Sequence, residues 1–448
     1  MKAEEYAGIP QKADFLRIKV APRVINHSSL TLLFWMGVFI LSKKRGAEIM
    51  SKSGNRGVLV LVTGSILQLF LGIIYVWSVF VTPVSERFSW GIENVKLTSS
   101  FMLCCFVLGI LIGGKLQVKT GTSKIVLAGG LLLSAGMLAT SFIPSGAAYL
   151  IYITYGIVGG FGVGMAYNAI ISCAQKWFPK KRGLATGISV CAFGFSTVLF
   201  APLIEALIKA YEVINTFRIL AAAFFVVVVA LFYFIKLPDD SGQAASPASE
   251  LLMKKKQYTT GQILKTKQFY YITLSLMLGT AAYFILNPSF KTFAEERNLA
   301  DVGTLIVMVT GVANALGRLL VPLLSDKIGR ERAALSILLA TMVSTLVLCY
   351  AGGIPFMAAI AVIAFCYGGY SGIYPLITAD YFGIKNVGSN YGAVMVGFAL
   401  SALFFPMLVG LVGNMTAKFF VLTVLAAAGA LMVILLMLSN KKQAKAKG

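Results

Sequence analysis

The stretch GVANALGRLLVPLLSDKIGR, residues 311–330, joins a long apolar run to a charged turn, and it decides the fold class. Arg318 lies inside the apolar run, about seven residues before Ser325, which places it roughly 10 Å into a membrane-spanning helix. An arginine at that depth costs about 2.5–3.5 kcal/mol on insertion. Asn314 lies one turn earlier on the same face. We interpret Arg318 as a cation that receives an anion; the alternative is that it reaches the headgroups or ties two helices together.

Composition places the whole chain in a membrane. Its 448 residues are 58% hydrophobic and 12% charged, with a mean hydropathy of +0.83. A soluble protein this apolar could not cover its own surface. The apolar runs are continuous and about twenty residues long, the length of a membrane-spanning helix. The predicted fold class is therefore an all-α polytopic membrane protein, with the lipid bilayer as its surroundings.

The charges and cysteines argue against several other functions. The net charge of +22 falls in short clusters between apolar runs, a pattern of cytoplasmic loops, so nucleic acid is not an expected partner. All six cysteines lie in apolar runs, which indicates packing. His27 is the single histidine and lies outside the apolar spans. We therefore expect no metal, no cofactor and no enzyme chemistry.

Twelve spans are predicted from residue 57 onward, in two six-helix halves. They lie at 58–81, 97–116, 125–143, 148–173, 184–206, 216–236, 269–290, 302–324, 333–352, 354–376, 390–412 and 418–438. The halves are residues 57–237 and 269–440. Residues 238–268 have the small polar residues, prolines and lysine run of a linker, and 441–448 form a basic tail.

Residues 1–56 form an N-terminal extension of a different character. The apolar run 30–41 is too short to span a membrane comfortably, and no cleavage pattern follows it. Met50 then opens MSKSGNRG, which resembles the start of a transporter. The extension is either a non-native upstream sequence or an interfacial helix.

Lysine and arginine concentrate in alternate loops, which predicts the orientation. Both bundle termini and the linker are expected to face the cytoplasm, and an even number of spans agrees with this. The expected location is the cytoplasmic (inner) membrane of a prokaryote, and the expected oligomeric state is a monomer.

The two halves also repeat in sequence. The loop AQKWFPKKRGLATG (174–187) after span four matches ADYFGIKNVGSNYG (379–392) after span ten. Aligning Trp177 with Tyr381 and Phe178 with Phe382 also places Gly164 over Gly368. The repeat indicates a duplicated six-helix unit, an arrangement typical of secondary transporters.

PLLSDKIGR (322–330) resembles the loop signature of the major facilitator superfamily, in which a glycine is followed by three residues, Asp, a basic residue, any residue, Gly and Arg. Asp326, Lys327 and Arg330 match, and Val118 stands where the first half should have its aspartate. The resemblance implies a cytoplasmic gating latch, in which these charges bridge to a neighbouring helix end in one conformation. The alternative is that the charges only set the orientation.

The chain is more closely similar to the oxalate/formate antiporter and monocarboxylate-transporter branch. The matching segments are YVW with TPV (75–84), AYNAI with KWFPKKRGLATG (166–187), NALGR with SDKIGR (314–330) and SNYG (389–392). The resemblance implies two pseudo-symmetric six-helix bundles of the major facilitator fold, which carry small carboxylates by alternating access. It also implies that Arg318 is the arginine that meets the substrate charge.

One position departs from the branch. Oxalate exchangers carry a buried lysine six residues after NYG, where this chain has Phe398. One cation among aromatic rings suits a monoanion, so lactate, pyruvate or formate is expected rather than oxalate. The alternatives are an oxalate:formate-type antiporter, and a facilitator carrier or efflux pump for another small molecule.

Few polar groups lie in the apolar spans, so the predicted substrate site has few candidate residues. Besides Arg318, its members are Gln68, Tyr75, Tyr167, Asn168, Asn314, Tyr367, Tyr370, Ser371 and Phe398. Arg318 would pair with the carboxylate while tyrosine hydroxyls and rings enclose the rest; packing is the alternative for Tyr75, Tyr167 and Tyr370.

Glu205 and Asp380 are the candidate carboxylates for proton coupling, although both lie near helix ends, where a solvated or latch charge is the alternative. Proton symport and anion exchange therefore stay open at this point.

Overall fold

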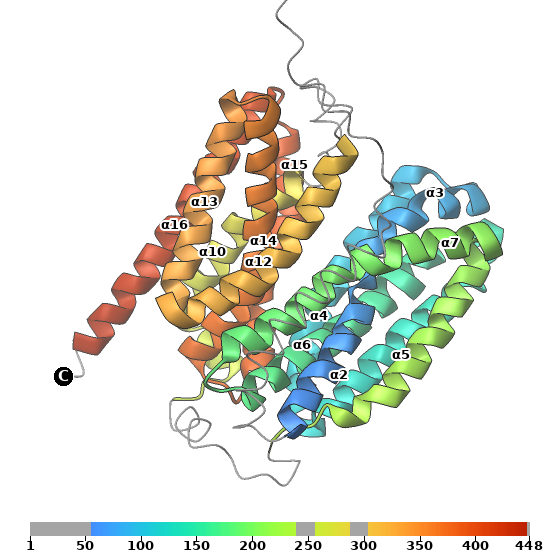
Figure 1. The fold of residues 1–448 in the computed structure, drawn as a ribbon, viewed down its shortest axis with the longest axis horizontal. Coiled ribbons are helices and arrows are strands. Elements are labelled where there is room, and N and C mark those ends of the chain that lie inside the picture. The colour runs from blue at the N-terminus through green and yellow to red at the C-terminus, as the bar shows by residue number, and fades with distance from the viewer. Residues whose placement is uncertain (1–54, 239–255, 287–302, 446–448) are drawn as a thin grey trace, which may run out of the picture. The chain divides into compact units, whose positions relative to one another are not determined.

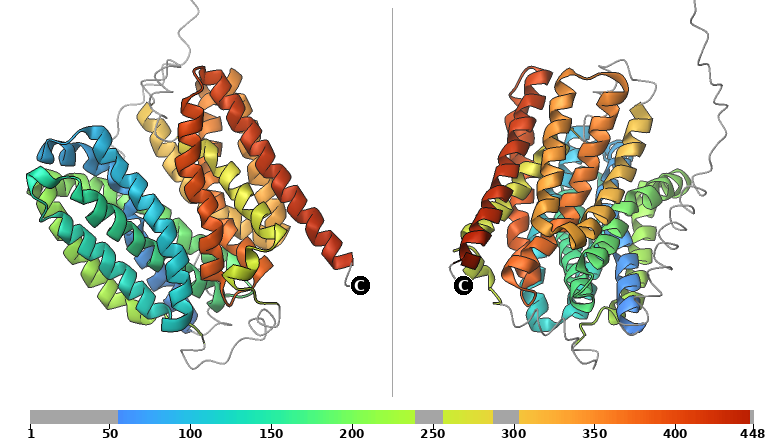
Figure 2. Two further views of the ribbon diagram at one scale, coloured as in Figure 1. Left: turned by 180° about the vertical axis from the view of Figure 1, so that it is seen from behind. Right: turned by 60° about the vertical axis from the view of Figure 1, so that its left-hand side comes forward.

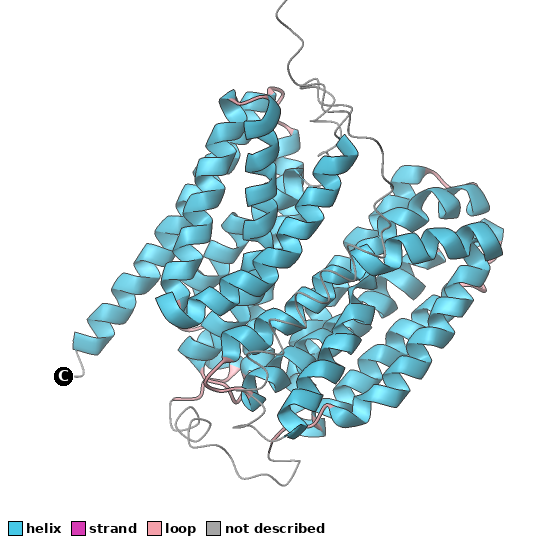
Figure 3. Ribbon diagram, viewed as in Figure 1, coloured by secondary structure: helices cyan, strands magenta, loops and turns pink. Residues whose placement is uncertain are grey.

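The computed structural model describes residues 55–238, 256–286 and 303–445. Nearly all of the predicted N-terminal extension, most of the linker and the end of the basic tail lie outside these ranges. Within them, helices are the regular secondary structure (Figure 3). The expected all-α fold class is confirmed.

The first half of the chain forms the helices coloured blue to green in Figure 1. They are α2 (Asn55–Leu71), η1 (Gly72–Val76), α3 (Trp77–Phe88), α4 (Ile92–Thr120), α5 (Thr122–Thr140), η2 (Ser145–Ala147), η3 (Tyr152–Gly159), α6 (Gly160–Trp177), α7 (Arg182–Leu231) and η4 (Phe232–Phe234). The long α7 contains two predicted spans, which meet at Glu212, where φ is 63°. A non-glycine residue with this φ interrupts the helix, so the chain turns there without a separate loop.

The second half forms the helices coloured yellow to red. They are α9 (Thr260–Ile263), α10 (Lys267–Leu286), α12 (Gly303–Ile328), α13 (Arg330–Tyr350), α14 (Gly353–Phe382), α15 (Val387–Gly410) and α16 (Met415–Lys445). Figure 2 shows α16 in red on the outer side of its bundle, extending past its neighbours at its C-terminal end.

Ten helical segments in the described ranges are long and apolar enough to cross a membrane. Together with the second crossing contained in α7 and with α12, they account for the twelve predicted spans. Large apolar side chains such as Val226, at 62% exposure, and Met407, at 75%, lie on the outside. Lipid is the solvent that such surfaces require.

The two bundles repeat a close helix contact. A β-carbon at Gly164 of α6 would collide with the carbonyl oxygen of Phe106 in α4. In the second bundle, a β-carbon at Gly368 of α14 would collide with the carbonyl oxygen of Asn314 in α12. Glycine lets the backbones approach this closely. The register proposed from the sequence repeat is therefore present in the packing.

The bundles meet at the end of the molecule where α6 and α14 finish and α7 and α15 begin; we call this the basic end (Figure 1). Two helix pairs join the bundles. Gly183 of α7 packs on the Pro322 carbonyl of α12, and Gly114 of α4 packs on Gly388 of α15. Each pair brings one helix of the first bundle against one of the second.

Candidate functional site

Arg318 is buried between the two bundles with polar but uncharged partners. Arg318 is 1% exposed. Its Nε donates to the Asn314 Oδ1 at 2.9 Å, and an Nη donates to the Tyr75 hydroxyl of the first bundle at 3.4 Å. The guanidinium carbon also lies 5.3 Å from the centre of the Tyr75 ring. No ion pair of Arg318 is found in the described ranges, so the buried cation has no opposite charge there.

Tyrosines from both bundles surround the guanidinium. The Tyr367 ring stacks on that of Tyr283 at 3.8 Å between centroids, and the Asn314 amide donates to the Tyr283 hydroxyl at 3.3 Å. The Tyr167 ring packs on Phe193 at 4.6 Å. This environment offers hydroxyl groups and ring faces around one positive charge, a combination that fits a small anion with an apolar part.

A small cavity lies among these aromatic side chains. Its lining residues are Tyr75, Phe106, Tyr167, Leu276, Ser371, Tyr391, Met395 and Phe398. The free volume is close to that of a single water molecule. In this conformation, the helices must move apart before a monocarboxylate can enter.

The structure brings most of the predicted substrate residues together. Tyr75, Tyr167, Ser371 and Phe398 line the cavity. Tyr367 lies beside Phe398, with ring centroids 6.2 Å apart.

Tyr370 is not placed with the cavity residues. Its hydroxyl hydrogen-bonds to the Thr341 hydroxyl at 2.9 Å and donates to the Ile337 carbonyl at 3.3 Å, both in α13. Its position inside the second bundle fits the packing alternative.

Gln68 and Asn168 hold the scaffold next to the cavity. The Gln68 amide donates to the Tyr167 carbonyl at 3.0 Å. The Asn168 amide donates to Ile110 in its own bundle at 3.0 Å and to Gly388 of the other bundle at 2.7 Å. Both amides donate to backbone carbonyls, and neither residue is among those that line the cavity.

Sequence reasoning missed several residues that line the cavity or bond to Asn314. The residues not predicted are Phe106, Leu276, Tyr283, Tyr391 and Met395. Tyr391 belongs to SNYG (389–392), one of the segments that carry the family resemblance, so it could have been predicted from the sequence. Leu276 and Met395 carry no chemical signal and need the three-dimensional contacts.

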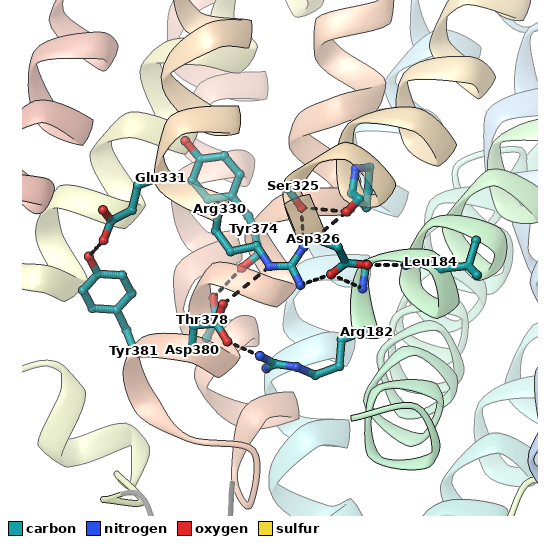
Figure 4. Close-up of polar contacts among 12 residues, drawn as sticks. Arg182, Leu184, Ser325, Asp326, Arg330, Glu331, Tyr374, Thr378, Asp380 and Tyr381 are labelled. Carbon is teal, nitrogen blue, oxygen red and sulfur yellow. Dashed lines mark hydrogen bonds and ion pairs between the residues drawn. The ribbon is translucent and has the colours of Figure 1, made fainter. Parts of the chain in front are cut away.

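The predicted latch joins the bundles at the basic end (Figure 4). The Asp326 carboxylate, at the end of α12, accepts from the backbone N–H groups of Gly183 and Leu184 at 3.2 Å each. It also pairs with Arg330. A carboxylate at the first turn of α7 satisfies unpaired donors and interacts with the helix dipole. Lys327 is exposed, and no ion pair of it is found among the described residues.

Asp380 belongs to the same cluster of charges. It pairs with Arg182 of the first bundle, and its other oxygen lies 3.5 Å from the Arg330 Nε. Figure 4 shows it between these two arginines. This placement fits the latch alternative for Asp380. Arg182 was not predicted as a latch residue, because its partner is 198 positions away in the sequence.

Glu205 lies on the exposed surface of α7. No group of His, Cys and carboxylate side chains that could hold a metal is found in the described ranges. The six cysteines are free thiols.

Comparison with known proteins gives relatives of similar length. The chain is 26% identical over 349 residues to the Uncharacterized MFS-type transporter YhjX of Escherichia coli (strain K12), covering 77% of this chain and 85% of the relative. It is 25% identical over 358 residues to the Oxalate:formate antiporter of Oxalobacter formigenes, covering 78% and 83%. A shorter match, 29% identical over 143 residues, joins 32% of the chain to 33% of Monocarboxylate transporter 13 of Rattus norvegicus.

The fold also matches solved transporters. The crystal structure of the Major Facilitator Superfamily transporter FucP in the outward conformation superposes with a TM-score of 0.65, at 13% identity, covering 85% of this chain and 99% of FucP. The family model for the Major Facilitator Superfamily matches residues 60–378 and 272–448. The chain is an integral membrane transporter and not an enzyme, and it belongs to the Major Facilitator Superfamily.

Proposed function

We propose that this transporter is a secondary active carrier of a small monocarboxylate, and that Arg318 receives the substrate carboxylate. The observation that carries the proposal is the buried guanidinium, held by Asn314 and Tyr75, with no ion pair in the described ranges. A desolvated cation is strongly stabilised when an anion binds to it. The named functions of the oxalate:formate and monocarboxylate relatives agree with an anionic substrate.

Phe398 supports a single negative charge on the substrate. The centroid of its ring lies 4.9 Å from that of Phe284, and the side chain lines the cavity. A second carboxylate against these rings would lose its hydration without a partner. Lactate, pyruvate and formate are therefore favoured over oxalate.

We further propose that the carrier exchanges one anion for another. Asp380 is paired in the latch, and Glu205 is exposed on α7, so neither candidate for proton coupling adjoins the cavity. With no anion bound, an unpaired guanidinium makes closure of the empty carrier costly. Return of the carrier with a second anion avoids that cost.

The proposed orientation places the basic end and both bundle termini in the cytoplasm of a prokaryotic inner membrane. Exposed lysines such as Lys119, Lys181 and Lys385 lie at this end, as the positive-inside rule requires. In this orientation, the latch of Asp326 and Asp380 closes the cytoplasmic side.

The test is counterflow in proteoliposomes with labelled formate, lactate, pyruvate and oxalate, each at two pH values. We expect uptake of a monocarboxylate that is accelerated by internal unlabelled anion and is unaffected by an imposed pH gradient. Arg318→Gln should abolish it. Arg218→Gln is the matched control, because Arg218 is an exposed arginine of α7 that bonds to Asn215 and is remote from the cavity.

Undiminished transport by Arg318→Gln would overturn the assigned role. Uptake driven by a proton gradient without internal anion would overturn exchange while leaving the substrate class intact. A panel with no transported carboxylate would favour a carrier for another kind of molecule.

A further inference from the structure

Gly194 of α7 lies directly against the side chain of Arg318. A β-carbon built on Gly194 would lie 2.7 Å from the Arg318 Cδ, 2.8 Å from its Nε and 3.3 Å from its Cζ. Contacts below 3.0 Å are essentially never made by real β-carbons. Because Gly194 of the first bundle has no side chain, the Arg318 side chain of the second bundle can occupy this space.

The backbone cannot easily yield to relieve such a contact. Gly183 packs on the Pro322 carbonyl, and a β-carbon at Gly187 would lie 2.9 Å from the Leu319 carbonyl oxygen. The start of α7 is also bonded to Asp326 of α12. The two helices are thus fixed close together, and an added methyl group at position 194 would have to displace the guanidinium.

The second pair of helices between the bundles shows what happens where no guanidinium is present. In α4 and α15, Gly388 packs on Gly114 and Gly392 packs on Leu111, as Gly183 and Gly187 pack on α12. Eleven residues beyond Gly183 is Gly194, whereas eleven residues beyond Gly388 is Ala399.

Ala399 lines a small cavity together with Leu103 and Cys104 of α4. The residue of α4 that corresponds to Arg318 in this repeat is the aliphatic Ile110. A methyl group is thus accommodated in this register when the facing helix carries no arginine. Helix packing alone therefore does not require glycine at position 194.

We propose that Gly194 is a positioning residue: the absence of its side chain sets the place of the Arg318 guanidinium beside Tyr75, which lines the cavity. The guanidinium is held by Asn314 on its own helix and by Tyr75 across the bundle interface. Gly194 bounds the Arg318 side chain on a third side. A displaced guanidinium would meet the substrate anion in the wrong place, and its bond to Tyr75, already 3.4 Å long, would be lost.

The first test needs no substrate. Thermal unfolding midpoints of the full chain in detergent are compared for the unsubstituted protein, Gly194→Ala, Arg318→Ala and the double variant. Arg318→Ala removes the atoms that the new methyl group would meet. We expect Gly194→Ala to lower the midpoint when Arg318 is present and to have a much smaller effect in the Arg318→Ala background. Equal effects in both backgrounds, including no effect in either, would overturn the proposal.

The second test rests on the proposed function and measures counterflow kinetics with labelled lactate. Gly194→Ala should raise the half-saturation concentration by about tenfold, since a misplacement of about 1 Å weakens an oriented contact strongly. Gly187→Ala is the matched control, because it adds a methyl group to the same interface against backbone atoms of α12. We expect it to lower the maximal rate and leave half-saturation nearly unchanged.

The outcomes separate the two proposals. Equal changes in half-saturation for Gly194→Ala and Gly187→Ala would overturn the role of Gly194. Transport retained by Arg318→Gln would reject the proposed function, and the unfolding cycle would still decide whether Gly194 positions the arginine. If Gly194→Ala fails to accumulate in membranes, recovery of accumulation in the double variant supports the proposal, and no recovery overturns it.

Discussion

The two helix pairs that join the bundles, α7 with α12 and α4 with α15, share a backbone arrangement and differ in chemistry. Both are packed through glycines that admit close approach. The α7–α12 pair contains the buried Arg318 and the helix-capping Asp326. At the corresponding places α4 has Ile110, fully buried, and Val118, 54% exposed. The two pairs therefore repeat one backbone arrangement, and the charged side chains Arg318 and Asp326 belong to the α7–α12 pair.

This difference assigns separate tasks to the two interfaces. The α4–α15 pair is held by glycine contacts and by the Asn168 amide on the Gly388 carbonyl, which involve no net charge. The α7–α12 pair contains a cation without an ion pair in the described ranges and a carboxylate bound to a helix end. Substrate and conformational changes alter the energy of charged groups far more than that of apolar contacts. Under the proposed function, the α7–α12 interface is therefore the one that would respond to the substrate anion.

The largest expected effect on the difference between the two helix pairs comes from Arg318→Ile. This substitution gives α12 the residue that α4 has at the corresponding position, Ile110. Loss of one partner of a buried charge pair costs about 3–5 kcal/mol, so substrate affinity should fall by at least about a hundredfold. Counterflow of labelled lactate measures it, with membrane abundance as the control. Near-normal half-saturation in this variant would contradict the assignment of Arg318.

Asp326→Val copies Val118 into the latch. It removes a helix cap and an ion pair, which are worth about 1–2 kcal/mol, so the conformation closed at the basic end should lose about tenfold in population. A cysteine introduced by Ser389→Cys, at a buried position of the basic end, should react faster with an impermeant maleimide in the Asp326→Val background.

The reciprocal change Val118→Asp serves as the control, because Val118 is exposed, and it should leave the labelling rate unchanged. If Asp326→Val raised half-saturation instead of the labelling rate, its role would lie in substrate binding and not in the latch.

Phe398→Lys sharpens the comparison by adding a second cation on α15. A dianion would then gain a charged partner worth about 1.4 kcal/mol or more, so the preference for oxalate over formate should rise by about tenfold. Competition between the two anions in counterflow measures the shift. An unchanged preference would remove the argument that a single charge selects a monoanion.

The smallest expected effects come from the tyrosine hydroxyls. Tyr75→Phe removes a long hydrogen bond to Arg318 and should raise half-saturation by about fivefold, equivalent to about 1 kcal/mol. Tyr370→Phe should change half-saturation very little, because its hydroxyl bonds to α13. Equal changes in half-saturation for the two substitutions would contradict the assignment of the Tyr75 hydroxyl to Arg318 and of the Tyr370 hydroxyl to α13.

Helix ends and helix connections were predicted less well than helix existence. The first span was predicted to end at residue 81, but the helical segment continues to Phe88. Spans five and six were predicted as separate helices and are joined through Glu212 in α7. Hydrophobicity locates the part of a helix that lies in lipid, whereas the polar ends follow local contacts and capping.

The candidate site was predicted in its charge and only partly in its surroundings. Arg318, Asn314 and Tyr75 could be found because polar groups in apolar helices are rare and costly. Tyr370 looked equivalent to Tyr75 in sequence, yet its hydroxyl points into its own bundle. The direction of a side chain around a helix depends on which neighbours the helix meets, and a single sequence does not contain that information.

The sequence by itself determined that the chain lies in a membrane, that its halves repeat and that one arginine is buried in the apolar core. Each of these follows from local composition and the cost of burying polar groups in lipid. The tertiary structure alone decided that Asp380 meets Arg182, that Asp326 caps α7 and that Gly194 adjoins Arg318. These contacts join residues more than a hundred positions apart, so they exist only where the two bundles close on each other.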